Sequence, residues 1–376
     1  TFSGGTLRFS AANTTDYSAR FSTEASQVYK IDTNGQSVTL AGALTSSGSS
    51  LSKFGAGTLT LSDESRYGNS SVGATVISEG KLALRVTHPS TVNAAAAFSG
   101  AGTLALENRG AGFTSAVTLS SALSFNTGSS SLGGLVIGRA GNTADLTLDA
   151  LPGGLTVTGS QAYYGGTVTI PTGANVNIVT RNNAGVLTLS AQTNVMIRSA
   201  IAINGTGGVA IETSQSAANG GTGTYSLGAS SSGFAGSVTF DDATNKSFTT
   251  RDGSNSANLK TYTLVSNLLS VRTAAASANL ALTGSVDATT FVNGSSAYGN
   301  VFAGTYNGTF AGLGHTISNL ILTNTDRYAG IFAQTSSATV RDLVVDNATI
   351  QGRHDTGTVV GYAAGTSNFS GLIVKN

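Results

Sequence analysis

The chain has 376 residues, of which 49 are glycine and only 10% are charged, and its net charge is +1. No basic stripe accompanies this small net charge, so a nucleic-acid-binding function lacks its usual electrostatic footprint. No apolar run is long enough to cross a bilayer as a helix, and the absence of cysteine excludes disulfides and is consistent with export through a periplasm.

A short cassette, a glycine followed by alternating polar and apolar residues, recurs along the chain. Its first three copies begin at Gly57, Gly80 and Gly102, which are 23 and 22 residues apart. Later copies occupy residues 154–157, 166–170, 185–189, 208–211 and 236–240. Each copy predicts a short strand opened by a turn. Repetition at this period predicts an all-β solenoid, in which each coil buries its apolar face against its neighbours.

Residues 1–258 are predicted to form one array of irregular coils. Strands of four to six residues alternate with Asn-Gly and Gly-Gly turns, and the three prolines, Pro89, Pro152 and Pro171, stand beside turns. Sustained helical periodicity with caps is absent, so we expect at most single helical turns, at residues 94–97 and 273–279.

The composition changes at about Leu259, and residues 259–376 are richer in aromatic and aliphatic side chains. The pattern is still strand, turn, strand, so we expect both regions to form one continuous rod. Thr1 is not an initiator methionine and a strand-like segment precedes the last two residues. We therefore expect a fragment of a longer protein, with strand edges at its ends that could associate end to end.

Two segments resemble known families. Residues 54–62, followed by Tyr67-Gly68 and residues 77–82, resemble the passenger-associated repeat of bacterial autotransporters. The stretch from 262 to 365 resembles the GLUG-type region of filamentous-haemagglutinin-like adhesins. Its matching steps are residues 286–288, the Gly-x-Gly-His-Thr-Ile-x-Asn-Leu run at 312–320, residues 341–343 and residues 359–361. Gly361-Tyr362 departs from the usual small or aliphatic step, and the amino-terminal secretion domain of such adhesins is not visible.

The resemblance implies a right-handed parallel β-helix that leaves a Gram-negative bacterium by type V secretion. It also implies a location at the cell surface or outside the cell. The implied partners are an outer-membrane transporter during export and a glycan or protein on a host or neighbouring cell. The secretion route, two-partner or self-transporting, stays open.

The alternative to a structural adhesin is a β-helical polysaccharide lyase or hydrolase. That function requires a groove with at least two carboxylates and a lysine or arginine. The acidic candidates are Asp241, Asp242, Asp342, Asp346 and Asp355, and we expect them to be solvated surface carboxylates. The three histidines are His88, His315 and His354, and a structural role is expected for His315. We therefore predict no enzyme and no catalytic, metal-binding or cofactor-binding residues.

Two residue types remain as candidates for surface roles. Asparagines that occur in Asn-x-Ser/Thr triplets, among them Asn69, Asn204 and Asn347, are expected to stack in ladders along the rod rather than to carry glycans. The aromatic candidates for contact with a sugar or a partner are Tyr163, Tyr164, Tyr298 and Tyr306. The competing interpretation, which we favour, is that these rings cover core edges at turns.

Overall fold

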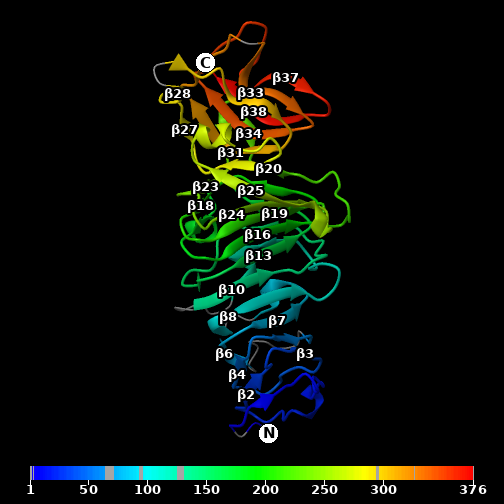
Figure 1. Cartoon of the computed structure of the whole chain (residues 1–376). Coiled ribbons are helices and arrows are strands. Elements are labelled where there is room, and N and C mark those ends of the chain that lie inside the picture. Colours follow the sequence, from blue (N-terminus) through cyan, green and yellow to red (C-terminus); the bar gives the residue numbers. More distant parts are fainter. Residues whose placement is uncertain are drawn as a thin grey trace.

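The computed structural model describes residues 2, 4–63, 72–92, 96–124, 131–293, 296–325 and 327–375. The protein is mostly β, with 50% strand and 6% helix, and its stacked strands form a long parallel sheet that is consistent with a β-solenoid. Figure 1 shows an elongated molecule in which strands follow one another from the N-terminal end towards the C-terminal end. The predicted all-β class is therefore confirmed, and the finer fold assignment stays a prediction.

The first part of the chain, here called the N-terminal stack, contains the strands from β1 to β24. One parallel ladder consists of β1 (Leu7–Arg8), β2 (Val28–Asp32), β4 (Ser49–Phe54), β6 (Val72–Ile77) and the start of β8 (Ala97–Asn108). The main ladder consists of β3 (Ser37–Leu40), β5 (Thr58–Leu61), β7 (Lys81–Val86), β8, β10 (Ser131–Ile137), β13 (Gln161–Gly165), β16 (Val186–Ala191), β19 (Gly208–Thr213) and β24 (Ser247–Asp252), and β12 (Thr156–Val157) also pairs with β10.

Two shorter ladders complete the sides of the N-terminal stack. One consists of β9 (Val117–Thr118), β11 (Leu146–Thr147), β14 (Val168–Ile170), β17 (Val195–Ile197) and β20 (Tyr225–Ser226). The other consists of β15 (Thr180–Arg181), β18 (Ala200–Ile203) and β23 (Ser237–Phe240), and β21 (Ala229–Ser230) forms a hairpin with β22 (Gly233–Phe234). The cassettes are thus strands, as predicted.

The second part, the C-terminal stack, repeats this arrangement with longer strands. Its main sheet consists of β25 (Leu259–Val265), β26 (Leu280–Leu282), β27 (Val286–Asp287), β31 (Thr309–Ser318), β34 (Thr339–Asp346) and β38 (Asn368–Lys375). The other sides consist of β30 (Asn300–Tyr306), β33 (Tyr328–Ser336), β36 (Asp355–Thr356) and β37 (Val360–Ala364), of β32 (Ile321–Thr323) with β35 (Thr349–Gln351), and of β28 (Val292–Asn293) with β29 (Ser296–Ala297).

Helices are short throughout the described residues, as the sequence predicts. The α-helices are α1 (Leu119–Ala122), α2 (Val176–Val179) and α3 (Leu268–Arg272), and the 3₁₀ turns are η1 (Ser18–Arg20), η2 (Pro89–Thr91) and η3 (Ser256–Asn258). Each lies at a corner between strands. His88 precedes η2, where its side chain accepts a hydrogen bond from the Ser90 backbone, which agrees with the predicted turn at Pro89.

The alternation in the cassettes explains the core. Leu59 of β5 lies in register with Val38 of β3 and with Leu82 of β7, and Leu82 in turn pairs with Leu104 of β8. All four side chains are buried, while Thr58 and Thr60 of β5 and Lys81 of β7 are partly exposed. Stacked apolar columns of this kind remove their surface from water, which contributes about 25 cal/mol per Å² of apolar surface.

Several of the cassette glycines meet a different constraint, which is the close approach of successive backbones at the turn before the strand. A Cβ atom at Gly80 would clash with the carbonyl oxygen of Gly57. The same contact recurs further along the stack, where Gly185 lies against the backbone of Gly159 and Gly207 against the carbonyl of Gly185. Columns of glycine therefore let one coil approach the next.

The two stacks meet where the strand direction reverses. β24 and β25 are antiparallel, with Phe248 opposite Tyr262, and the buried side chains divide into two clusters. Ala281 of β26 belongs to the core of the N-terminal stack, whereas its neighbours Leu280 and Leu282 belong to the core of the C-terminal stack. The outer face of the C-terminal main sheet thus packs on the last coil of the N-terminal stack. The parallel winding is interrupted here, because a strand that pairs antiparallel with the last coil cannot continue it, and the expectation that both regions belong to one continuous rod stays a prediction.

Substituting one column glycine tests the backbone packing. We expect Gly185→Ala to lower the free energy of unfolding by about 1–3 kcal/mol, because the added methyl group must displace the backbone of Gly159. Gly153→Ala is the matched control, since nothing lies within 4 Å of a Cβ there, and we expect a change within about 0.5 kcal/mol. Urea unfolding followed by circular dichroism measures both; equal effects of the two substitutions would refute the column argument.

Candidate functional site

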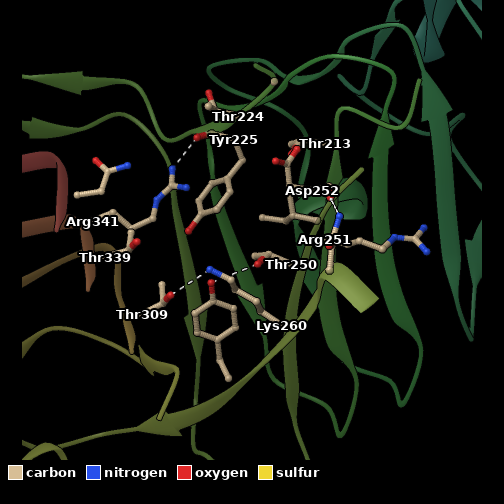
Figure 2. Close-up of a pocket in the computed structure, with 15 residues that line it drawn as sticks. Thr213, Thr224, Tyr225, Thr250, Arg251, Asp252, Lys260, Thr309, Thr339 and Arg341 are labelled. Carbon is tan, nitrogen blue, oxygen red and sulfur yellow. Dashed lines mark hydrogen bonds between the residues drawn. The ribbon is translucent and has the colours of Figure 1, made fainter. Parts of the chain in front are cut away.

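A cleft lies at the seam between the two stacks. It has a volume of about 270 Å³ and is lined by residues of β19, β20 and β24 on one side and of β25, β31 and β34 on the other. A second hollow of about 370 Å³ adjoins it and shares Tyr225, Arg341 and Asn368 with it. Figure 2 shows Arg341 and Thr339 facing Tyr225 across the first hollow. We call the two hollows together the junction cleft.

Arg341 crosses the seam and binds the N-terminal stack. Its guanidinium lies 3.6 Å from the centroid of the Tyr225 ring, and its Nη2 donates a hydrogen bond of 2.7 Å to the Tyr225 carbonyl. Its Nε donates to Oδ2 of Asp342 at 2.7 Å. One side chain therefore joins the two stacks by a cation–π contact and a hydrogen bond, and it also forms an ion pair with its neighbour in β34.

The backbone of β34 explains how Arg341 and Asp342 both reach the seam. Asp342 has a φ of 55°, in the left-handed region that side-chain-bearing residues seldom occupy. The register between β31 and β34 also shifts between Ala311 and His315. This irregularity breaks the strict alternation of the strand, so two consecutive side chains line the same cleft.

The charges of the junction cleft compensate one another. Burial raises the pKa of Asp342, although Arg341 acts in the opposite direction. Burial would lower the pKa of Arg341, but Tyr225 and Asp342 raise it. Burial also holds the pKa of the Tyr225 hydroxyl well above its ordinary value. At neutral pH the Arg341 guanidinium is charged and the Tyr225 phenol is neutral, which is compatible with a structural contact between the two stacks.

The rim of the junction cleft is more open. The Lys260 side chain is exposed and donates a hydrogen bond of 3.3 Å to Thr309 Oγ1, and Asp252 is exposed and accepts one of 3.5 Å from Thr213 Oγ1. The hydroxyl groups of Thr250 and Tyr262 are 3.2 Å apart. A cation, a carboxylate and several hydroxyls can hydrogen-bond a polar ligand at this rim.

His315 forms a second contact across the seam. It is 6% exposed, and its Nε2 donates to the carbonyl oxygen of Val238 in β23 at 2.8 Å. Burial lowers the pKa of the imidazole, so the neutral ring is favoured. The burial and the hydrogen bond agree with the packing role predicted for His315, although the residue lies within β31 and not in a turn. Lys375, at the end of β38, also forms a contact across the seam, because its Nζ donates to the carbonyl oxygen of Ser232 at 2.6 Å.

Two of the four tyrosines proposed as surface contacts are not on the surface. Tyr163 and Tyr306 are fully buried, and their hydroxyls donate to Gln161 Oε1 at 2.9 Å and to the Ala278 carbonyl at 2.6 Å. The surface prediction is therefore wrong for both, because each ring occupies an inward position of its strand. Tyr164 and Tyr298 are half-buried, and for them surface contact stays a prediction.

The acidic candidates are dispersed rather than gathered. Lys246 binds both Asp241 and Asp242, with distances of 2.6 and 2.8 Å to their carboxylate oxygens. Asp355 lies 3.5 Å from Arg327 in an exposed pair, beside the exposed His354. The expectation that Asp342 is solvated is wrong, because the kink at this residue turns its side chain into the seam. Asp346, at the end of β34, is partly exposed.

The predicted asparagine ladders are confirmed at Asn347 and Asn204, whereas Asn13 donates to the Tyr17 hydroxyl instead. Asn347 Nδ2 donates to Asn319 Oδ1 at 2.7 Å, and Asn204 Nδ2 donates to Asn182 Oδ1 at 3.0 Å. Each pair joins equivalent turns of successive coils. Asn69 and the Tyr67-Gly68 step lie outside the described residues.

A buried lysine escaped the sequence analysis. Lys53 is fully buried, and its Nζ donates to Thr33 Oγ1 at 3.0 Å, to the Gly57 carbonyl at 2.7 Å and to the Glu79 carbonyl at 3.0 Å. Burial lowers its pKa to about 8, although Asp32 and Glu79 oppose this. The alternation of β4 could have predicted this burial, because Lys53 follows the buried Leu51 by two residues and therefore lies on the same face of the strand.

Comparison with known proteins gives no relative: no protein-family model, curated protein or solved structure matches the chain. Within the described ranges, no group of three or more His, Asp or Glu side chains is placed to hold a metal ion. Likewise, no helix in those ranges is long and apolar enough to cross a membrane.

Removal of Arg341 tests its role as a strut. We expect Arg341→Met to lower the free energy of unfolding by roughly 3 kcal/mol, because the Asp342 carboxylate is left buried without its partner. Arg327→Met is the control, since its pair with Asp355 is exposed and its loss costs under about 1 kcal/mol. Hydrogen exchange of the Arg341→Met variant at Val238, Tyr225 and their neighbours would show whether the seam opens first. Protection equal to that of the wild type at these residues would contradict the structural role of Arg341.

Proposed function

We propose that this chain is a length of right-handed parallel β-helix from a secreted bacterial adhesin or surface fibre. The observation that carries the proposal is the long parallel sheet of stacked strands, which gives the molecule its elongated form (Figure 1). Such a stack is held by contacts between neighbouring coils, so it can extend without a closed core. An elongated molecule with a large lateral surface can contact a partner at a distance from the cell, which is what attachment requires.

The resemblance of residues 54–82 and 262–365 to autotransporter and filamentous-haemagglutinin-like sequences supports the same proposal. It adds a Gram-negative source, export through an outer-membrane transporter and a place at the cell surface or in the medium. The partner is then a glycan or protein of a host or neighbouring cell. Nucleic acid is not among the proposed partners, because the net charge of +1 provides no general attraction to phosphate.

End-to-end association belongs to the proposal as well. At the C-terminal end, the outer strands β37 and β38 expose Tyr362, Phe369 and Val374. At the N-terminal end, the rings of Phe2, Phe21 and Tyr29 pack against one another with centroid distances of 4.9 to 5.9 Å. Apolar side chains on an outer strand favour pairing with another strand, so the C-terminal edge is the proposed contact.

Attachment is tested with beads that carry the purified chain. We expect these beads to be retained under flow on layers of epithelial cells or of bacteria, because a folded lateral surface is available for contact. Beads coated with chain that was first unfolded in denaturant, and beads coated with albumin, are the controls. Retention no greater than that of the controls on every layer would refute the adhesin.

One observation favours the alternative of a β-helical polysaccharide lyase or hydrolase. The junction cleft is lined by Asp252, Asp342, Lys260 and Arg341, which is the composition that such an enzyme requires. Cations could neutralise the carboxylate of a uronic acid while a second group takes a proton. Against this, the guanidinium of Arg341 is already bound to Tyr225 and Asp342.

The enzyme alternative is tested with acidic and neutral polysaccharides. The adhesin proposal predicts neither new unsaturated ends, measured by ultraviolet absorbance, nor new reducing ends. If turnover occurs, we expect Lys260→Ala and Asp252→Asn to reduce it at least tenfold, whereas Lys246→Ala, outside the cleft, leaves it unchanged. Turnover that depends on Lys260 and Asp252 would replace the adhesin with the enzyme.

A further inference from the structure

A separate pocket lies in the N-terminal stack, between two successive coils. It has a volume of about 350 Å³ and is bordered by residues 151–161 of one coil and 177–183 of the next. Side chains span the gap between these coils: Asn177 Nδ2 donates to the Leu151 carbonyl at 3.0 Å, and Asn183 Nδ2 donates to the Val157 carbonyl at 3.2 Å. At these points side chains, and not a strand ladder, link the two coils. We call it the Arg181 pocket.

Arg181 carries an uncompensated charge into this pocket. The residue is 2% exposed, and its hydrogen bonds both leave from Nη2, to the Gly159 carbonyl at 2.5 Å and to Asn183 Oδ1 at 3.4 Å. Its Nε is buried without a hydrogen-bond partner. Among the described residues, no carboxylate forms an ion pair with it.

An arginine in this state differs from the other buried cations. The ammonium of Lys53 is surrounded by four oxygen atoms within hydrogen-bond distance, and Arg341 has Asp342. Arginine does not lose its proton in proteins, so the charge of Arg181 cannot be removed by titration. A buried charge without a counter-ion is unfavourable, and an anion that enters the pocket would remove this cost.

The lining indicates which anion fits. Guanidinium groups bind planar carboxylates with two donors at once. Around Arg181, the Thr156 hydroxyl and the amide hydrogens of Gln161 and Asn182 can bond sugar hydroxyls, while Leu155 provides an apolar wall. The amide oxygens of Gln161 and Asn182 already accept hydrogen bonds from Tyr163 and Asn204. The volume lies within the range of roughly 300–1,000 Å³ that small-molecule sites occupy, and well above that of a single small ion.

We propose that the Arg181 pocket binds the carboxylate of an acidic sugar, with Arg181 as the anchor. The biological meaning of this site rests on the proposed adhesin function, since it would make acidic glycans the class of partner that the stack recognises. The binding itself can be measured without that function.

The test is a titration of the intact chain with sodium glucuronate, glucose and inorganic phosphate, followed by ligand-observed NMR. We expect glucuronate to bind, and glucose and phosphate to bind at least tenfold more weakly. Thr156 is exposed at the pocket, so its variants change the local charge with little effect on folding. We expect Thr156→Asp to weaken glucuronate binding at least tenfold and Thr156→Lys to strengthen it severalfold.

Thr23→Asp is the matched control, because Thr23 is also an exposed threonine but lies at the N-terminal end of the stack, and it should leave binding unchanged. Arg181→Lys keeps the charge and loses the planar fork, so we expect weaker binding with an unchanged circular dichroism spectrum. Equal binding of phosphate and glucuronate, or binding that ignores both Thr156 variants, would overturn the proposal. If glucuronate binds as expected while coated beads fail to attach, the sugar site stands and the adhesin function fails.

Discussion

The close approach of one coil to the next is the constraint on which this structure depends. Parallel strands lie about 4.8 Å apart, and at the corners before the main ladder this distance leaves no room for a side chain. Gly57 and Gly80, and again Gly159 and Gly185, stand in contact there. This close approach at the corners allows the strands to hydrogen-bond in parallel and the apolar side chains, such as Leu59 and Leu82, to stack in columns.

Buried cations serve the same stacking in two ways. Lys53 donates to carbonyl oxygens near the corner glycines, so a charge replaces donors that the irregular backbone cannot provide. Arg341 acts between the stacks, where it binds a ring, a carbonyl and a carboxylate. Arg181 is the exception, because its guanidinium is only partly satisfied by the chain itself. The difference separates two structural cations from a proposed binding site.

The seam between the stacks bears on both proposals of function. Its cleft has the residues that an enzyme would need, yet Arg341, Asp342 and Tyr225 already bind one another. The contacts of His315 and Lys375 add to this connection. A seam held in this way lets two parallel stacks of opposite strand direction form one elongated body, which suits attachment at a distance better than it suits turnover.

The sequence by itself determined the class of fold and the strands that form it, because alternation and the glycine spacing are local properties that each coil repeats. It also indicated the asparagine ladders and the structural role of His315. Only the tertiary structure decided the reversal at β25, the burial of Tyr163 and Tyr306, and the pairing of Arg341 with Tyr225. These depend on residues up to 116 positions apart and on one left-handed residue, Asp342. Neither leaves a periodic signal, since contact between distant coils is set by how the stacks pack and not by local pattern.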